Sequence, residues 1–216
     1  MPKVPVRASV EQLPAYKSGA RPNGRLIHKL SSNELPYPPL PGVLAAVEDA
    51  AADLNRYPRM LAEELVDGIG RFYGLESNQV AVGAGAIAVL AHTMAAFVPE
   101  GAEVVYGWRS FEAYPILVGV AGARPVEVPL GPGGRLDLET MASAVTPKTR
   151  AILVCTPNNP TGPAVHRDEF AAFMAVVPTD VLVVADEAYV DFVTDPDAVN
   201  AVAALADYPN LLAVRT

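Results

Sequence analysis

Short apolar runs rich in β-branched residues alternate with longer helix-like runs from residue 79 to the end of the 216-residue chain. Runs of the first kind predict strands, over residues 79–82, 103–106, 124–128, 151–155, 181–185 and 211–214. Runs of the second kind predict helices, over residues 87–97, 114–121, 138–145, 168–176 and 199–206. Such alternation predicts an α/β fold with a mostly parallel sheet, in which fully apolar strands such as 151–155 are covered on both faces.

Residues 1–42 follow a different pattern, dominated by proline, which blocks helix interiors and central strands. We expect an extended arm there, followed by helices over residues 43–54 and 61–73, the second of them ending at Gly74. The chain stops directly after the predicted strand 211–214, although a parallel strand normally feeds a crossover helix. The sequence therefore reads as the front part of a longer protein.

Polar or glycine-rich segments follow several predicted strands, at residues 83–86, 107–111, 156–162 and 186–189. In a parallel α/β sheet, ligands bind beyond the carboxyl ends of the strands. These segments are expected to meet at one edge of the sheet and to form a site there.

The glycine-rich segment Gly83-Ala84-Gly85-Ala86 lies between a predicted strand and a predicted helix. Glycines at this position let the backbone approach a phosphate, which the free N–H groups of the helix N-terminus bind. The segment also fits the dinucleotide fingerprint, but the next strand lacks the carboxylate that binds ribose, so a single phosphate is favoured. The alternative is a turn that only lets the helix pack closely.

Asp186 follows a run of apolar residues, and a carboxylate at a dry strand end needs a partner. A protonated ring nitrogen on a cofactor is one such partner, and an N-cap role is the alternative. Tyr189 lies three residues later and can reach the same ligand. Either Phe111 or Trp108 could stack on an aromatic cofactor, or both could be core rings.

Composition limits the possible functions. Hydrophobic residues make up 51% of the chain and the net charge is −8, without a basic cluster for nucleic acid. The single cysteine, Cys155, excludes an internal disulfide and favours a reducing, cytoplasmic location. The sequence shows no ligand spacing for a metal, no apolar run long enough for a membrane helix, and no signal-peptide pattern.

Two motifs, Pro-Asn-Asn-Pro-Thr-Gly at residues 157–162 and Asp-Glu-Ala-Tyr at residues 186–189, resemble those of the fold-type I pyridoxal-phosphate aminotransferases. Ser-Ser-Asn-Glu at 31–34 and Arg-Tyr-Pro at 56–58 are similar to the histidinol-phosphate and aromatic aminotransferase branch. Residues 107–115 resemble phenylalanine or aromatic aminotransferases of actinobacterial type. The resemblance implies a three-layer, aspartate-aminotransferase-like large domain at residues 43–216, incomplete, after an arm at 1–42, with the C-terminal small domain missing.

The resemblance also implies pyridoxal 5′-phosphate as cofactor, and a role for each matching residue. Asp186 would pair with the ring nitrogen, Phe111 would stack on the ring, and Asn159 and Tyr189 would hold the ring's 3-oxygen. Backbone N–H groups around Gly85, Ala86 and Ile87 would hold the phosphate. The implied homodimer would share its sites, because Tyr57 would reach the partner subunit's cofactor. Tyr16 would cover the substrate and Asn33 would lie near its carboxylate.

The implied reaction is transamination of phenylalanine or tyrosine with 2-oxoglutarate. Alternatives are a histidinol-phosphate aminotransferase, a lyase or decarboxylase on the same fold, and a non-catalytic truncated fragment. Two departures stand out: Ala86, Ile87 and Ala88 replace the family's usual hydroxyl and acidic residues, and the Schiff-base lysine would fall just after Thr216. No catalytic residue is therefore assigned within the chain, which ends there by truncation or at a modified lysine.

Overall fold

The computed structural model describes residues 4–13 and 32–216. It divides into two compact units, one comprising Met1–Pro14 and Ala81–Thr216 and the other Ala15–Val80. The expected boundary between arm and large domain, at residue 42, falls inside the second unit and stays a prediction.

The first unit is built on a five-stranded sheet in which every paired strand runs parallel, in the order β2-β1-β3-β4-β5. The strands are β1 (Glu103–Trp108), β2 (Arg124–Pro129), β3 (Thr149–Cys155), β4 (Leu182–Asp186) and β5 (Leu211–Val214). The sequence predicted all five to within two residues at each end, and the α/β fold with a parallel sheet is confirmed.

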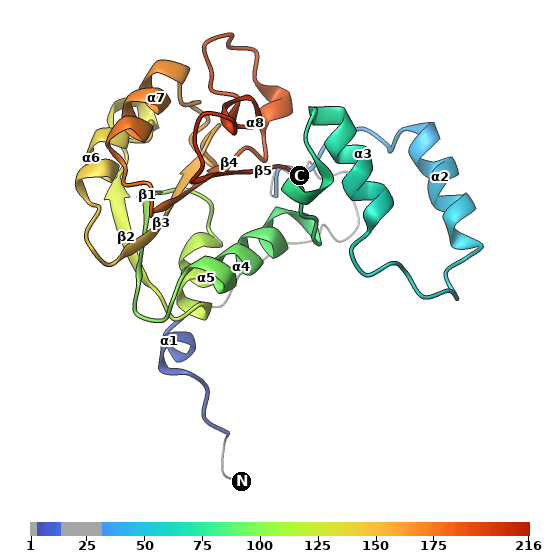
Figure 1. Cartoon of the computed structure of the whole chain (residues 1–216), viewed down its shortest axis with the longest axis horizontal. Coiled ribbons are helices and arrows are strands. Elements are labelled where there is room, and N and C mark those ends of the chain that lie inside the picture. Colours follow the sequence, from blue (N-terminus) through green and yellow to red (C-terminus); the bar gives the residue numbers. More distant parts are fainter. Residues whose placement is uncertain (1–3, 14–31) are drawn as a thin grey trace, which may run out of the picture. The chain divides into compact units, whose positions relative to one another are not determined.

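Alternate strand residues pack into two separate cores, which gives the unit three layers (Figure 1). Ile152 and Val183 belong to the core under α6 (Leu138–Ser143), α7 (Arg167–Val176) and α8 (Ala201–Ala204). Leu153 and Val184 belong to the core under α4 (Gly85–Phe97) and α5 (Tyr114–Val120). Side chains alternate between the two faces along a strand. The position of the last residue of β4 therefore decides which layer of helices its side chain faces.

Hydrogen bonds between side chains and the backbone set where α6, α7 and α8 begin. The Asp137 carboxylate accepts the Thr140 N–H at 2.9 Å and starts α6, and Asn200 caps α8 in the same way. At α7, the Glu169 side chain accepts the N–H of the N-cap residue His166. Short 3-10 helices lie in the connections, at η2 (Pro132–Gly134) and η3 (Val190–Phe192).

The predicted strand over residues 79–82 is wrong. The structure has a 3-10 helix there, η1 (Ser77–Gln79), and the Val80 N–H donates to the Ser77 carbonyl rather than to a strand. A strand exists only when a neighbour accepts its hydrogen bonds, and among the described residues no strand pairs with this segment. An apolar, β-branched run is therefore not sufficient for a segment to form a strand.

The two longest helices of the second unit's described residues are α2 (Pro41–Ala51) and α3 (Glu63–Tyr73). Gly74 ends α3 with a φ of +70°, as predicted, because only glycine adopts that conformation without strain. The proline pattern did not predict α1 (Ala8–Glu11), which belongs to the first unit and packs on α5. No helix among residues 4–13 and 32–216 is long and apolar enough to cross a membrane.

Candidate active site

The carboxylate of Asp186 ends β4 in a buried position. Its backbone lies in register between Cys155 of β3 and Val214 of β5, and the residue is only 3% exposed. Ala185 faces the core under α6, α7 and α8, so Asp186 faces the opposite layer, on the side of α4 and α5. The sequence predicted this strand-end carboxylate, and the structure shows that it does not lie in solvent.

Tyr114, the first residue of α5, reaches this carboxylate. Its hydroxyl donates to Asp186 Oδ2 at 2.7 Å, while Asp186 Oδ1 accepts the Ala188 N–H at 3.2 Å. Burial raises the pKa of the Asp186 carboxyl, and these two donors partly oppose the rise. Sequence reasoning missed Tyr114; the available signal was its position three residues after Phe111, at the start of the helix that follows the second polar segment.

Cys155 lies beside Asp186 at the end of β3. Burial and the neighbouring Asp186 raise the pKa of its thiol to about 11. A thiol that stays protonated at neutral pH is a poor nucleophile, which supports the sequence interpretation of a core residue.

The two asparagines of the turn after β3 have different environments. Asn158 is buried: it accepts the Ser110 hydroxyl at 2.7 Å and donates to the Arg109 carbonyl and the Thr161 hydroxyl. Its polar atoms are therefore used inside the protein. Asn159 is half-buried, and its Nδ2 lies 3.5 Å from the Tyr189 hydroxyl, at the long end of hydrogen-bond distances. The structure thus brings Asn159 and Tyr189 together.

The glycine-rich turn leads into α4 with its amide groups uncapped. Gly85 opens the helix with a φ of +74°, and its own N–H donates to the Gly83 carbonyl at 2.8 Å. No side chain of the described chain caps this helix. Because first-turn N–H groups lack acceptors within the helix, those of Ala86 and Ile87 can donate to a partner from outside it.

The aromatic residues at the end of β1 and just after it divide between two environments. Trp108 packs edge-on against Tyr106, and the Arg109 guanidinium lies 5.4 Å from the centre of its ring. Phe111 meets the edge of the Tyr114 ring, with 5.6 Å between ring centres, and remains half-buried. Phe111 is therefore connected, through Tyr114, to Asp186.

The remaining expected residues lie elsewhere in the chain. Asn33, with a φ of +49°, and Tyr57, which is 95% exposed, both belong to the second unit. Tyr16 lies outside the described residues. The roles assigned to these three side chains stay predictions.

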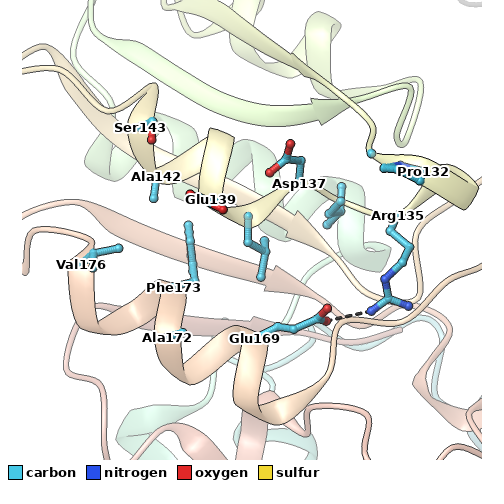
Figure 2. A pocket seen from close by; sticks show the side chains of 13 residues that line it. Pro132, Arg135, Asp137, Glu139, Ala142, Ser143, Glu169, Ala172, Phe173 and Val176 are labelled. Carbon is cyan, nitrogen blue, oxygen red and sulfur yellow. Dashed lines mark hydrogen bonds and ion pairs between the residues drawn. The ribbon is translucent and has the colours of Figure 1, made fainter.

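A groove of about 910 Å³ lies between α6 and α7, on the sheet face away from Asp186 (Figure 2). Figure 2 shows the Phe173 side chain between the two helices and Arg135 near Glu169. Arg135 and Glu169 form an ion pair at 2.8 Å, and the Asp137 side chain caps α6. Because these charged groups already have partners, the groove shows no unpaired buried charge comparable to Asp186.

Comparison with known proteins agrees with this arrangement. The family described as aminotransferase class I and II matches residues 26–216. The chain belongs to this family. The resemblance seen in its motifs at residues 157–162 and 186–189 is thereby confirmed.

Relatives within the aminotransferase family match almost the whole chain. Proteins named aromatic amino acid aminotransferase are 49% identical over 214 residues in Thermobifida fusca and 50% identical over 210 residues in Cutibacterium acnes. These matches cover 98% and 97% of this chain and 59% of each relative. The chain thus spans about 59% of the length of the curated relatives it matches.

Solved aminotransferase structures share the fold. A histidinol-phosphate aminotransferase from Sinorhizobium meliloti, crystallised in complex with pyridoxal-5′-phosphate, matches with a TM-score of 0.79 and 30% identity. An aspartate aminotransferase from Rhizobium meliloti matches with a TM-score of 0.77 and 26% identity. Each match covers 86% of this chain and 50% of the solved chain.

Proposed function

We propose that the protein is a pyridoxal-phosphate-dependent aminotransferase that exchanges the amino group between an aromatic amino acid, phenylalanine or tyrosine, and 2-oxoglutarate. The family match supports the reaction class. The names of relatives that are 47–50% identical to this chain support the aromatic donor. Because the chain spans only part of those relatives, the activity of the whole protein is inferred.

The buried carboxylate of Asp186 is the observation that carries the proposal. No Arg, Lys or His side chain lies within ion-pair distance of it among the described residues. A buried carboxylate without a cation is costly, and a protonated pyridine nitrogen supplies the missing positive charge. The residues present therefore fit the cofactor.

Other groups of the site fit the rest of the cofactor. The N–H groups of Ala86 and Ile87 would bind its phosphate, Phe111 would cover the ring, and Asn159 with Tyr189 would hold the ring oxygen. When bound, pyridoxal phosphate withdraws electrons from the α-carbon of an amino acid. The charged Asp186 would keep the ring nitrogen protonated, which maintains that withdrawal.

The direct test uses the full-length protein. We expect it to bind pyridoxal phosphate and to convert phenylalanine or tyrosine with 2-oxoglutarate, with kcat/KM at least tenfold above that for histidinol phosphate. Asp186→Asn should lose most of the activity, whereas Asp207→Asn, a change at an exposed aspartate, should retain it. Absence of cofactor binding, or of any aminotransferase activity, would contradict the proposal.

Histidinol phosphate is the second candidate donor, favoured by the solved structure with a TM-score of 0.79. The two donors differ at the end far from the amino group, an aromatic ring against an imidazole with a phosphate. If histidinol phosphate has the higher kcat/KM in the same assay, the second candidate replaces the first.

We further propose that the enzyme is a homodimer in which Tyr57 serves the partner subunit's site. Tyr57 is 95% exposed, and α2 has no buried residue while Val43, Leu44 and Val47 are exposed on it. Exposed apolar residues of this kind are common at interfaces.

Mixing inactive subunits tests this arrangement. Heterodimers of Tyr57→Phe and Asp186→Asn subunits would contain one intact site if Tyr57 crosses over, and the mixture should regain about a quarter of the activity. No recovery is expected if each Tyr57 serves its own subunit. Light scattering should give the mass of a dimer.

Two further sequence interpretations remain predictions. The position of the Schiff-base lysine stays a prediction, and borohydride reduction of the cofactor-loaded protein followed by peptide mass spectrometry would locate it. The cytoplasmic location is checked by cell fractionation.

A further inference from the structure

Tyr114 connects the two groups that would contact the cofactor ring on different sides. It is fully buried, its hydroxyl contacts Asp186 Oδ2 at 2.7 Å, and its ring contacts Phe111 edge-on. Its ring also packs against Tyr106, with 5.8 Å between ring centres. Tyr114 therefore has little freedom to move, and its hydroxyl is fixed with it.

The Tyr114 hydroxyl is the one side-chain donor to Asp186 among the residues described, and the Ala188 N–H is the other donor. One donor binds each carboxylate oxygen, which fixes the rotation of the carboxylate plane. A carboxylate held by two directional donors is pre-organised toward its remaining partner. Without the hydroxyl, only one oxygen would stay anchored.

We propose that Tyr114 is a positioning residue that holds the charged Asp186 carboxylate in place for the ring nitrogen of the cofactor. The proposal rests on the proposed function, because it assigns the task of Tyr114 at that same site. Tyr114 acts through Asp186 and takes no part in proton transfer.

The groups around Asp186 make its protonation measurable. Tyr114 from α5 and Cys155 from β3 are its titratable neighbours, β5 contributes Val214, and the first turn of α4 is apolar. Burial raises the pKa of the Tyr114 phenol well above its usual value and that of the Cys155 thiol to about 11. Because both neighbours stay protonated at neutral pH and burial raises the pKa of the Asp186 carboxyl, Asp186 is the member of this cluster whose charge changes on acidification.

The experiment measures binding of pyridoxine 5′-phosphate to the full-length, cofactor-free protein between pH 5 and 9. This probe has an alcohol in place of the aldehyde, so it cannot react with a lysine and reports only ring and phosphate contacts. Binding should weaken at acid pH as Asp186 loses its charge. Tyr114→Phe removes one of the two donors that oppose the effect of burial on the pKa of Asp186. The acid limb of the binding curve should therefore move up by about one pH unit.

Tyr106→Phe is the matched control. Tyr106 is also fully buried and packs against Tyr114, but its hydroxyl contacts Glu127 at 3.2 Å and not Asp186. The control should show the wild-type acid limb. In an Asp186→Asn background, Tyr114→Phe should cause no shift, because the group it acts on is gone.

The outcomes separate the two proposals. If Tyr114→Phe coincides with wild type and with Tyr106→Phe, or if its shift persists in the Asp186→Asn background, the assignment of Tyr114 is overturned while cofactor binding stands. If wild type does not bind the probe at any pH, the proposed function fails and the assignment fails with it. Should Tyr114→Phe alone not fold, the double variant, which has no buried charge to satisfy, still supplies the comparison with Asp186→Asn.

Discussion

Asp186 and Glu187 are consecutive buried carboxylates, and within residues 4–13 and 32–216 only Glu187 has a cationic partner. Glu187 Oε2 accepts the Nε and Nη2 of Arg215 at 2.9 and 2.8 Å, and its Oε1 accepts the Ala201 N–H at 2.7 Å. From the described part of the chain, Asp186 accepts the Tyr114 hydroxyl and the Ala188 N–H. We propose that the first carboxylate pairs with a ligand, whereas the second ties the ends of β4 and β5 to α8.

The Glu187–Arg215 pair should contribute substantially to stability. We expect Glu187→Gln to lower the free energy of unfolding by about 2 kcal/mol, because it removes the charged partner of the mostly buried Arg215 side chain in this ion pair. Urea unfolding of the full-length protein at pH 7 measures this. Asp197→Asn, which breaks the exposed Arg167–Asp197 pair, should cost less than about 0.5 kcal/mol. Equal losses of stability in Glu187→Gln and Asp197→Asn would contradict the stabilising role of the Glu187–Arg215 pair.

Asp186 should destabilise the cofactor-free protein at neutral pH. Folding raises the pKa of its carboxyl, so the stability gained from the bound proton is complete below the unfolded pKa, about 3.9. That gain is lost as the pH rises through the folded pKa. Asp186→Asn should therefore be more stable than wild type at pH 7, by about 1 kcal/mol, and the difference should shrink toward pH 4.

Asp195 offers a control of opposite sign for the same measurement. The Asp197 N–H and the His166 side chain lower the pKa of this exposed carboxyl. The stability that the charged Asp195 carboxylate contributes is present above its unfolded pKa and is lost as the pH falls through its folded pKa. Asp195→Asn should thus lower the thermal unfolding midpoint at pH 7 and have no effect in acid. If both variants change in the same direction, the linkage argument is wrong.

Cys155 should react slowly with thiol reagents in the native protein. With a pKa of about 11, only about one thiol in a thousand is ionised at pH 8, and the residue is only 2% exposed. A disulfide reagent should modify the thiol in minutes in urea-unfolded protein and at least a hundredfold more slowly in native protein. Rapid modification of native Cys155 would show that the end of β3 opens readily.

The two asparagines after β3 should separate stability from cofactor binding. Asn158→Ala should lower the free energy of unfolding by about 2 kcal/mol, because it leaves the buried Ser110 hydroxyl without its acceptor and removes the donor to Arg109 and Thr161. Asn159→Ala should change stability by less than about 0.5 kcal/mol and weaken binding of pyridoxine 5′-phosphate about tenfold. The reverse pattern would exchange the roles of the two residues.

The elements of the first unit could be located largely from the sequence. Residues 151–155 of β3 and 182–185 of β4 are apolar throughout because helices cover both faces, and this leaves a local signal. The segment 79–82 carries a similar signal and forms no strand, since pairing depends on a neighbour that local pattern does not encode. The one-turn helix α1 was missed because it is too short for a periodic pattern.

The sequence by itself determined the family, through its motifs at residues 157–162 and 186–189, and the resemblance named Asp186, Phe111, Asn159 and Tyr189 as candidate residues. Their positions after strands also predicted a shared site, because parallel strands place their carboxyl ends along one edge. Only the tertiary structure decided which groups meet Asp186. Tyr114 lies 72 positions away in the chain and reaches it through the packing of α5 on the sheet. Local periodicity records burial and secondary structure, whereas contacts between distant residues depend on strand order, register and helix packing, which form only when the whole unit folds.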